Sequence, residues 1–254
     1  TDIAVLVTDM ATYKPVLEYV FDGGRQVPYN LVDSSAAMES IYGQAVLALL
    51  GLAAGDFTRK EVFQVILNPC FLAGVRACRE DALQWLEWAD KLGIYRTFGE
   101  TPADDSSAPA PFTWEQGLKR LRFGRIMDPA GPAAATAETT ESTEFYTFDG
   151  TAPYADMASS DSRSIGQFCA VIEALHTRLA PLRKGEFTIG QWRQRLVSLC
   201  EQFLGIPPER ATESYVQRAM FSSLEQAEHF DALTAVDTRM PLPLLRELVK
   251  SALV

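Results

Sequence analysis

The spacing of hydrophobic positions changes near residue 34 of this chain. Residues 3–8 form a continuous apolar run rich in β-branched side chains, which is typical of a strand buried on both faces. Asp9 stands where a helix N-cap belongs, ahead of an amphipathic stretch over 12–21, and residues 27–31 return to an extended pattern. Residues 1–34 are therefore predicted to form one β-α-β unit. Because two strands make a poor sheet alone, we expect the rest of the sheet elsewhere in a longer chain.

From residue 35 onward the apolar positions recur at helical spacing. The pattern predicts helices over 36–54, 61–67, 79–92, 113–127, 164–183, 189–204, 210–229 and 241–253. Thr58 and Glu61 have the spacing of a capping box, and Pro69 is expected to interrupt the helix that they open.

Two stretches lack an apolar period and are rich in Pro, Ala, Thr and acidic residues, so long loops are predicted near 99–111 and over 128–150. The expected fold class is mainly α. A multi-helix domain over 35–254 should follow a small β-α-β edge over 1–34.

Composition is that of an ordinary globular chain, with 47% hydrophobic and 10% aromatic residues among 254. No apolar run reaches the ~18–20 residues that a membrane helix needs, and no signal-peptide pattern opens the chain, so we expect a cytoplasmic protein without a membrane partner. The chain begins Thr1-Asp2-Ile3 and enters its first strand almost at once. We therefore expect it to be a piece of a longer protein.

The net charge of −10 argues against strong autonomous DNA binding, which depends on Lys and Arg neutralising phosphates. One segment departs from this balance, because residues 112–125 interleave bases with aromatic side chains. Its candidate DNA-contacting residues are Lys119, Arg120, Arg122 and Arg125. Lys119, Arg122 and Arg125 recur every three residues and share one helix face. The alternative interpretation is a solvated face opposite a core stripe, whose members would be Trp114, Leu118, Leu121 and Phe123.

Machinery for catalysis is not evident in the sequence. It has no phosphate-binding G-x-x-x-x-G-K-[ST] loop and no G-x-S-x-G nucleophile motif. The four cysteines lack metal-ligand spacing, and Cys169 and Cys200 are expected to be buried fillers of the core. His176 and His229 are far apart and are expected on helix surfaces. We therefore predict no catalytic residue, no cofactor and no metal site.

Several motifs resemble one known family. Residues 3–7 with Asp9, Tyr13 and Pro15, then Val27-Pro28-Tyr29 and Asp33, resemble a strand–helix–strand of the second motor domain of superfamily 1 DNA helicases. In those proteins this unit leads into a large inserted helical subdomain, called 2B. The form seen here is most similar to RecC-type gamma subunits of exodeoxyribonuclease V, and AddB-type proteins come next.

Later motifs resemble the same family in the same order. Thr113-Trp114, Gly117-Leu118, Arg120 and Gly124 follow its T-W-x-x-G-L-x-R…G pattern, and residues 92–96 are similar to its S-G-I-R-W run. Two positions depart from the pattern. Thr8 stands where active helicases of this superfamily have an arginine that reaches the nucleotide, and Ser34 stands where the family often has another arginine. A threonine cannot supply the charge that stabilises phosphoryl transfer.

The resemblance implies a motor-like fold that has lost its ATPase and a chain that has no ATPase or nuclease residues of its own. It further implies partnership with a RecB-like motor–nuclease and a RecD-like second motor, and DNA in the context of that complex. The implied role is scaffolding or a DNA channel in double-strand break repair and recombination. The main rival hypothesis is a helical protein–protein interaction module that does not contact DNA.

Overall fold

The computed structural model of this protein describes residues 40–99, 110–126, 151–156, 161–234 and 238–253, with the single residues Tyr13 and Val20. The predicted β-α-β unit and the predicted loop over 128–150 lie outside the described residues. The helices are α3 (Ile41–Ala54), α4 (Arg59–Ile66), α5 (Pro69–Val75), α6 (Arg79–Lys91), α7 (Trp114–Ile126), α8 (Ser162–Arg183), α9 (Ile189–Phe203), α10 (Glu213–Thr234) and α11 (Leu242–Ala252), with a short 3₁₀ turn η2 (Pro208–Arg210).

The prediction of a mainly α fold is confirmed. In the described part of the chain the only sheet is an antiparallel pair of two-residue strands, β1 (Glu186–Phe187) and β2 (Met240–Pro241), with Phe187 opposite Met240. The Trp192 indole N–H of α9 donates to the Met240 carbonyl at 2.8 Å. These contacts fix the entry to α11.

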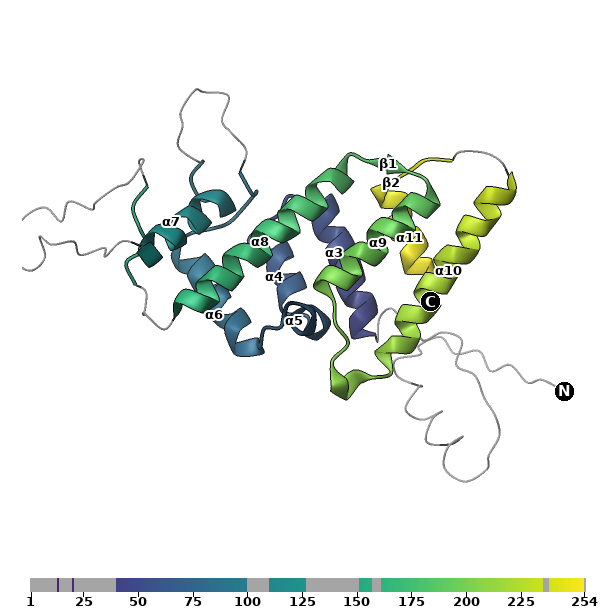
Figure 1. The fold of residues 1–254 in the computed structure, drawn as a ribbon, viewed down its shortest axis with the longest axis horizontal. Helices are drawn as coiled ribbons and strands as arrows, with labels where there is room; N and C mark the ends of the chain where they lie inside the picture. Colours follow the sequence, from purple (N-terminus) through teal and green to yellow (C-terminus); the bar gives the residue numbers. More distant parts are fainter. Residues whose placement is uncertain are drawn as a thin grey trace, which may run out of the picture.

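The helices form an elongated body in which α8 crosses the middle (Figure 1). Helices α6 and α7 lie toward one end of it, and α9, α10 and α11 lie toward the other. Helix α3 packs against α4, α5, α8, α10 and α11. Its sequence contains no charged residue, and a helix that is apolar all round is stable when other helices surround it.

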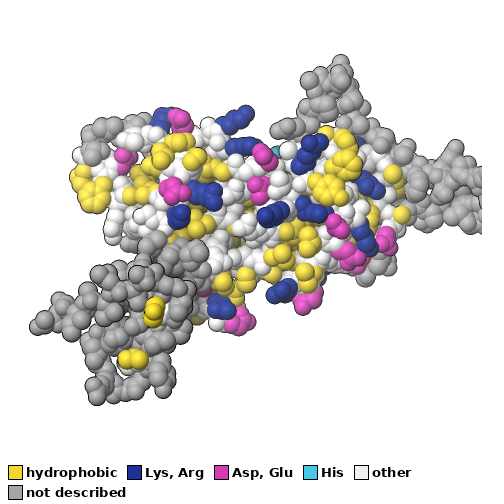
Figure 2. Space-filling model, turned by 180° about the vertical axis from the view of Figure 1, so that it is seen from behind, with side chains coloured by type: hydrophobic (Ala, Val, Ile, Leu, Met, Phe, Trp, Pro, Cys, Tyr) yellow, Lys and Arg dark blue, Asp and Glu magenta, His cyan; other side chains and the backbone are white. Residues whose placement is uncertain are grey.

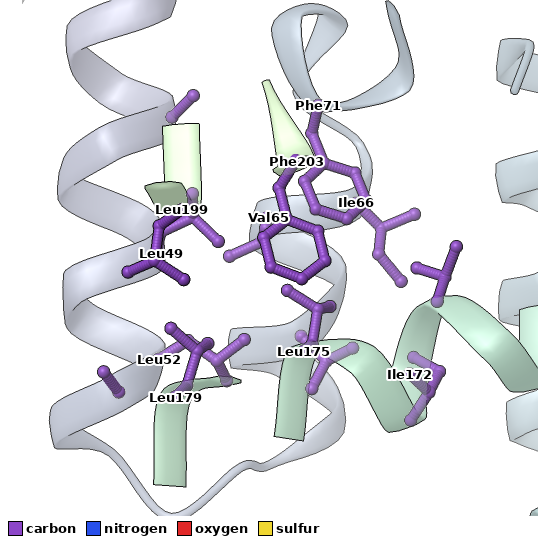
Figure 3. Close-up of a cluster of buried hydrophobic side chains, with 14 of the residues drawn as sticks. Leu49, Leu52, Val65, Ile66, Phe71, Ile172, Leu175, Leu179, Leu199 and Phe203 are labelled. Atoms are coloured by element: carbon purple, nitrogen blue, oxygen red, sulfur yellow. The ribbon is translucent and has the colours of Figure 1, made fainter. Parts of the chain in front are cut away.

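The side chains labelled in Figure 3 come from α3, α4, α5, α8 and α9 and belong to one buried apolar cluster. Leu49 and Leu52 from α3 lie there with side chains from α4, α8 and α9. The Phe71 ring of α5 stacks on the Phe203 ring of α9, with centroids 6.1 Å apart and planes 9° from parallel. The α5 backbone also approaches α9 closely, because a Cβ atom added at Gly74 would lie 2.3 Å from the Phe203 carbonyl oxygen.

The start of α3 is capped by a side chain from the far end of the chain. Ser40 is the N-cap residue, and its hydroxyl donates to the Glu213 carboxylate at the first residue of α10. The amides of Ile41 and Tyr42 donate to the same carboxylate at 3.3 and 3.0 Å. Because the first amides of a helix have no partner within it, the buried carboxylate satisfies them and joins α10 to α3.

Most predicted helix boundaries agree with the structure to within a few residues, and Thr58 and Glu61 form the predicted capping box. The prediction at Pro69 was incomplete. Pro69 separates α4 from a further helix that it opens as the first residue, and Asn68 caps that helix by accepting from the Cys70 amide at 2.8 Å. Proline is tolerated there because the first turn needs no intrahelical N–H donor. Helix α5 was therefore not predicted from the sequence.

Candidate nucleic-acid interface

Helix α7 carries all four bases that the sequence singles out. Its inner side is formed by Trp114, Leu118 and Leu121, which are buried as expected of a core stripe, whereas Phe123 is half-buried. The Trp114 indole N–H donates to the Phe57 carbonyl at 2.8 Å and thereby fixes the start of the helix. The backbone of α7 is therefore well anchored.

The four basic side chains of α7 contact different neighbours. Arg122 forms an ion pair with Glu173 of α8 at 2.6 Å, and a Cβ atom added at Gly166 of α8 would lie 3.2 Å from the Arg125 guanidinium. Arg120 donates through Nε to the Ala152 carbonyl at 3.2 Å. Lys119 lies over the Phe123 ring, 5.7 Å from its centroid. Arg122 and Arg125 thus face α8, while Arg120 faces residues 151–154.

Charge on the surface is mixed. On the face seen from behind, Lys and Arg side chains are interspersed with Asp and Glu side chains (Figure 2). Several bases are paired, such as Arg183 with Asp56 and Lys91 with Asp156, both at 2.7 Å. Among the described residues seen in this view, no large region carries a single charge.

A second feature, absent from the sequence interpretation, lies at the start of α7. Three segments, residues 57–59, 93–99 and 112–115, are hydrogen-bonded to one another through their backbones; we call them the crossover. The Arg59 amide donates to the Tyr95 carbonyl at 3.2 Å, and the Tyr95 amide donates to the Phe112 carbonyl at 3.1 Å. The Trp114 amide donates to the Thr97 carbonyl at 3.2 Å. The middle segment is thus held from both sides.

The crossover concentrates unfavourable backbone conformations. Phe57, Thr97 and Phe112 all have positive φ angles, of 60°, 34° and 65°, in a region that side chains other than glycine rarely adopt. Such residues cluster at functional sites, where the surrounding structure holds them in place. For Phe57 the packing explains the positive φ, because its buried ring contacts Trp114 edge-on with centroids 6.5 Å apart. Phe112 has no comparable burial.

The outer side of the crossover presents two aromatic rings. Tyr95 is 55% exposed and Phe112 is 52% exposed, with ring centroids 6.1 Å apart and planes tilted by 51°. The Arg59 guanidinium lies 5.0 Å from the Tyr95 centroid, and Asp90 pairs with it at 2.6 Å. Gly93, with φ of 66°, lies beneath the rings, since a Cβ atom there would be 3.4 Å from Phe112.

The inner side of the crossover borders a small pocket of about 120 Å³. His176 of α8 stacks on Phe98 in its wall, with centroids 3.8 Å apart and planes 5° from parallel. Burial lowers the pKa of His176 below its usual range, and the nearby Glu115 carboxylate partly opposes this. The expectation that His176 lies on a helix surface was therefore incomplete, because the imidazole is half-buried between packed rings.

Three of the four cysteines act as core residues, whereas Cys78 is exposed. Cys169 and Cys200 are buried as predicted, and so is Cys70. Burial raises the pKa of Cys70 to about 12 and that of Cys169 and Cys200 to about 11, so all three are protonated thiols near neutral pH. No group of three or more His, Cys, Asp or Glu side chains that could hold a metal ion occurs within the described ranges.

These observations describe an α-helical domain whose candidate contacts lie on its surface. The model of one family, the fourth domain of the RecBCD enzyme subunit RecC, matches residues 39–254, and the chain belongs to this family. This confirms the family to which the motifs pointed.

Two relatives are both named RecBCD enzyme subunit RecC. The protein of Escherichia coli K12 is 29% identical over 135 residues, which cover 51% of this chain and 12% of that protein. The protein of Haemophilus influenzae is 25% identical over 130 residues, or 50% of this chain and 11% of that protein. The match thus spans about an eighth of the relatives' length. Among the helices that the structure describes, none is both long and apolar enough to cross a membrane.

Proposed function

We propose that this chain is a non-catalytic part of a RecC-type subunit and that it scaffolds a helicase–nuclease complex and contributes to its DNA channel. The complex would act in double-strand break repair and recombination. The observation that carries the proposal is the match of the RecC fourth-domain family to residues 39–254. Its partners would be a RecB-like motor–nuclease subunit, a RecD-like motor subunit and, within the complex, DNA, all in the cytoplasm.

We also propose which part of a RecC-type subunit each segment of the chain forms. Residues 1–34 would be the β-α-β edge of a helicase-like motor domain, and 35–254 the inserted 2B-like subdomain. The body of packed helices supports a scaffolding role, because one continuous core joins α3 to α11 and offers partners a stable surface. The proposed lack of ATPase activity rests on Thr8 at the position of the nucleotide-sensing arginine.

On α7 we propose Lys119, Arg120, Arg122 and Arg125 as DNA contacts. The Arg122–Glu173 pair is compatible with this role, since its side chains are 49% and 39% exposed. An exposed ion pair contributes only about 0–1 kcal/mol, so a phosphate could replace Glu173 as the partner of Arg122. Contacts of this kind would bind the DNA backbone without reading its sequence.

Assembly with the partner subunits tests the scaffolding role. The chain should co-purify with its RecB- and RecD-type subunits and should be required for a complex that unwinds duplex DNA. A complex that forms and unwinds DNA without this chain would overturn the proposal, and so would ATP hydrolysis by the chain alone.

Charge reversal tests the DNA contacts, with a swapped ion pair as its control. R122E and R125E should weaken binding of forked DNA by the assembled complex, most at low salt. R122E places a second carboxylate beside that of Glu173, so the double variant R122E/E173R restores the pair in reverse. If Arg122 binds phosphate, the double variant keeps the binding defect. If it regains wild-type binding, Arg122 has only a structural role.

A protein–protein module without DNA contact is the second candidate. The net charge of −10 favours it, as does the engagement of Arg120 and Arg122 by neighbours within the chain. It predicts that the α7 variants leave DNA binding by the complex unchanged at every salt concentration.

A further inference from the structure

We infer that Tyr95 and Phe112, with Arg59, form a stacking site for the bases of single-stranded DNA. The inference rests on the proposed function, and it adds a site that lies apart from the basic residues of α7. The Phe112 backbone has a φ of 65°, which is unfavourable for a phenylalanine. Phe57 has a similar angle but buries its ring, whereas the Phe112 ring remains 52% exposed.

The neighbourhood of Phe112 holds the ring in that exposed position. The Phe112 amide donates to the Gln116 side chain at 2.9 Å, and its carbonyl accepts from the Tyr95 amide at 3.1 Å. Gly93 lies beneath the ring, where a Cβ atom would be 3.4 Å away, and its φ of 66° is one that glycine adopts readily. Because these contacts fix the backbone on both sides, the two rings are held in place before any ligand arrives, which reduces the entropy lost on binding.

The chemistry of the site suits unpaired bases. Every base has a π face, and stacking on aromatic side chains binds single strands with little sequence preference. The tilt of 51° leaves Tyr95 and Phe112 unstacked on each other. Arg59 lies 5.0 Å from the Tyr95 centroid and adds a cation to the site.

Charge near these rings also favours a nucleic acid. Asp90 pairs with Arg59, but Lys60 and Arg96 follow Arg59 and Tyr95 directly in sequence and are exposed. Although the net charge of the chain is −10, the surface around Tyr95 and Phe112 thus carries exposed cations next to exposed rings. At the end of the molecule that carries α7, hydrophobic, basic and acidic side chains adjoin on the surface seen in Figure 2.

Photo-crosslinking tests the inference directly. The assembled complex would be bound to a poly-dT single strand that contains 5-iodo-deoxyuridine, irradiated and mapped by mass spectrometry. We expect crosslinks at Tyr95 or Phe112. Y95A and F112A should each lower the affinity for poly-dT about 5- to 150-fold, the range expected from the loss of one base–aromatic stack. Crosslinks confined to other segments, with unchanged affinity in both variants, would overturn the inference.

Two controls separate stacking from folding. Tyr215 of α10 is 68% exposed and carries Arg218 at 4.8 Å over its ring, but it lies outside the crossover, so Y215A should bind poly-dT like the wild type. F112G and F112A both remove the ring. Glycine tolerates the positive φ better than alanine, so the F112G variant should be more stable to urea than the F112A variant. Equal loss of binding in both variants shows that the ring itself binds DNA. If instead the less stable variant loses more of its DNA binding, the inference is wrong.

The outcomes also distinguish this site from the proposed function. If the complex assembles and binds poly-dT with wild-type affinity in Y95A and F112A, only the stacking site is wrong. If the two variants weaken assembly with the partner subunits while the assembled complex keeps its affinity, the rings contact protein, and the stacking site is again wrong. If no complex forms even with the wild-type chain, the proposed function itself fails.

Discussion

The helical body around α3 and the crossover at the start of α7 use hydrogen bonds and side chains differently. In the body, regular helices bury apolar side chains, and the buried Glu213 carboxylate satisfies the first amides of α3. In the crossover, irregular segments are joined by isolated backbone hydrogen bonds, non-glycine residues adopt positive φ angles, and two aromatic rings face solvent. The body is organised for stability, whereas the crossover holds exposed groups at a conformational cost.

The largest expected effect is the difference in stability between removing one aromatic ring from the body and removing one from the crossover. Phe203 stacks on Phe71 inside the body and is 2% exposed, so F203A should lower the free energy of unfolding by about 3–5 kcal/mol. Tyr95 is mostly exposed, and Y95A should change that free energy by about 0.5 kcal/mol or less. Urea denaturation of both variants measures the difference. Similar losses would show that the crossover is as important for stability as the body.

An intermediate effect is expected at the joint between α10 and α3. E213A removes the acceptor for Ser40 and for two helix amides, and leaving such buried donors without a partner should destabilise the fold by about 1–3 kcal/mol. E209A, at an exposed position of η2, is the matched control and should change stability by about 0.5 kcal/mol or less. Equal stability of the two variants in urea would rule out a stabilising role for the Glu213 cap.

The same contrast explains what could be predicted from the sequence. The body was predictable because helix periodicity and capping boxes depend on residues a few positions apart, as at Thr58 and Glu61. The Glu213 cap was not, because its partners lie more than 170 positions away in sequence. For a similar reason the sequence placed Arg122 on a basic face but could not show its pairing with Glu173 of α8.

The crossover had almost no signal in the sequence. Its hydrogen bonds connect Arg59, which directly follows the predicted N-cap Thr58, with Tyr95 and Phe112, which lie outside the predicted helices. A positive φ is usually indicated by glycine or asparagine, and here only Gly93 gave that signal. Phenylalanine and threonine at such angles cannot be anticipated, since their intrinsic preferences favour other conformations. The two exposed rings can be recognised as neighbours only in the structure, where the three segments of the crossover lie together.

The smallest expected effect concerns the pH dependence of the crossover. Burial against Phe98 lowers the pKa of His176, so between pH 7 and 5 the unfolded chain binds a proton at this residue more readily than the folded chain. The contribution of His176 to stability is therefore complete above its unfolded pKa of about 6.5 and is lost as the pH falls through the lower folded value. Glu115 opposes the shift, and the imidazole is only half-buried, so the loss should be small. H176F keeps an aromatic ring for the stack but cannot titrate. Urea denaturation at pH 7 and pH 5 should show a larger fall for the wild type than for H176F, and equal falls would mean that protonation of His176 does not weaken the crossover.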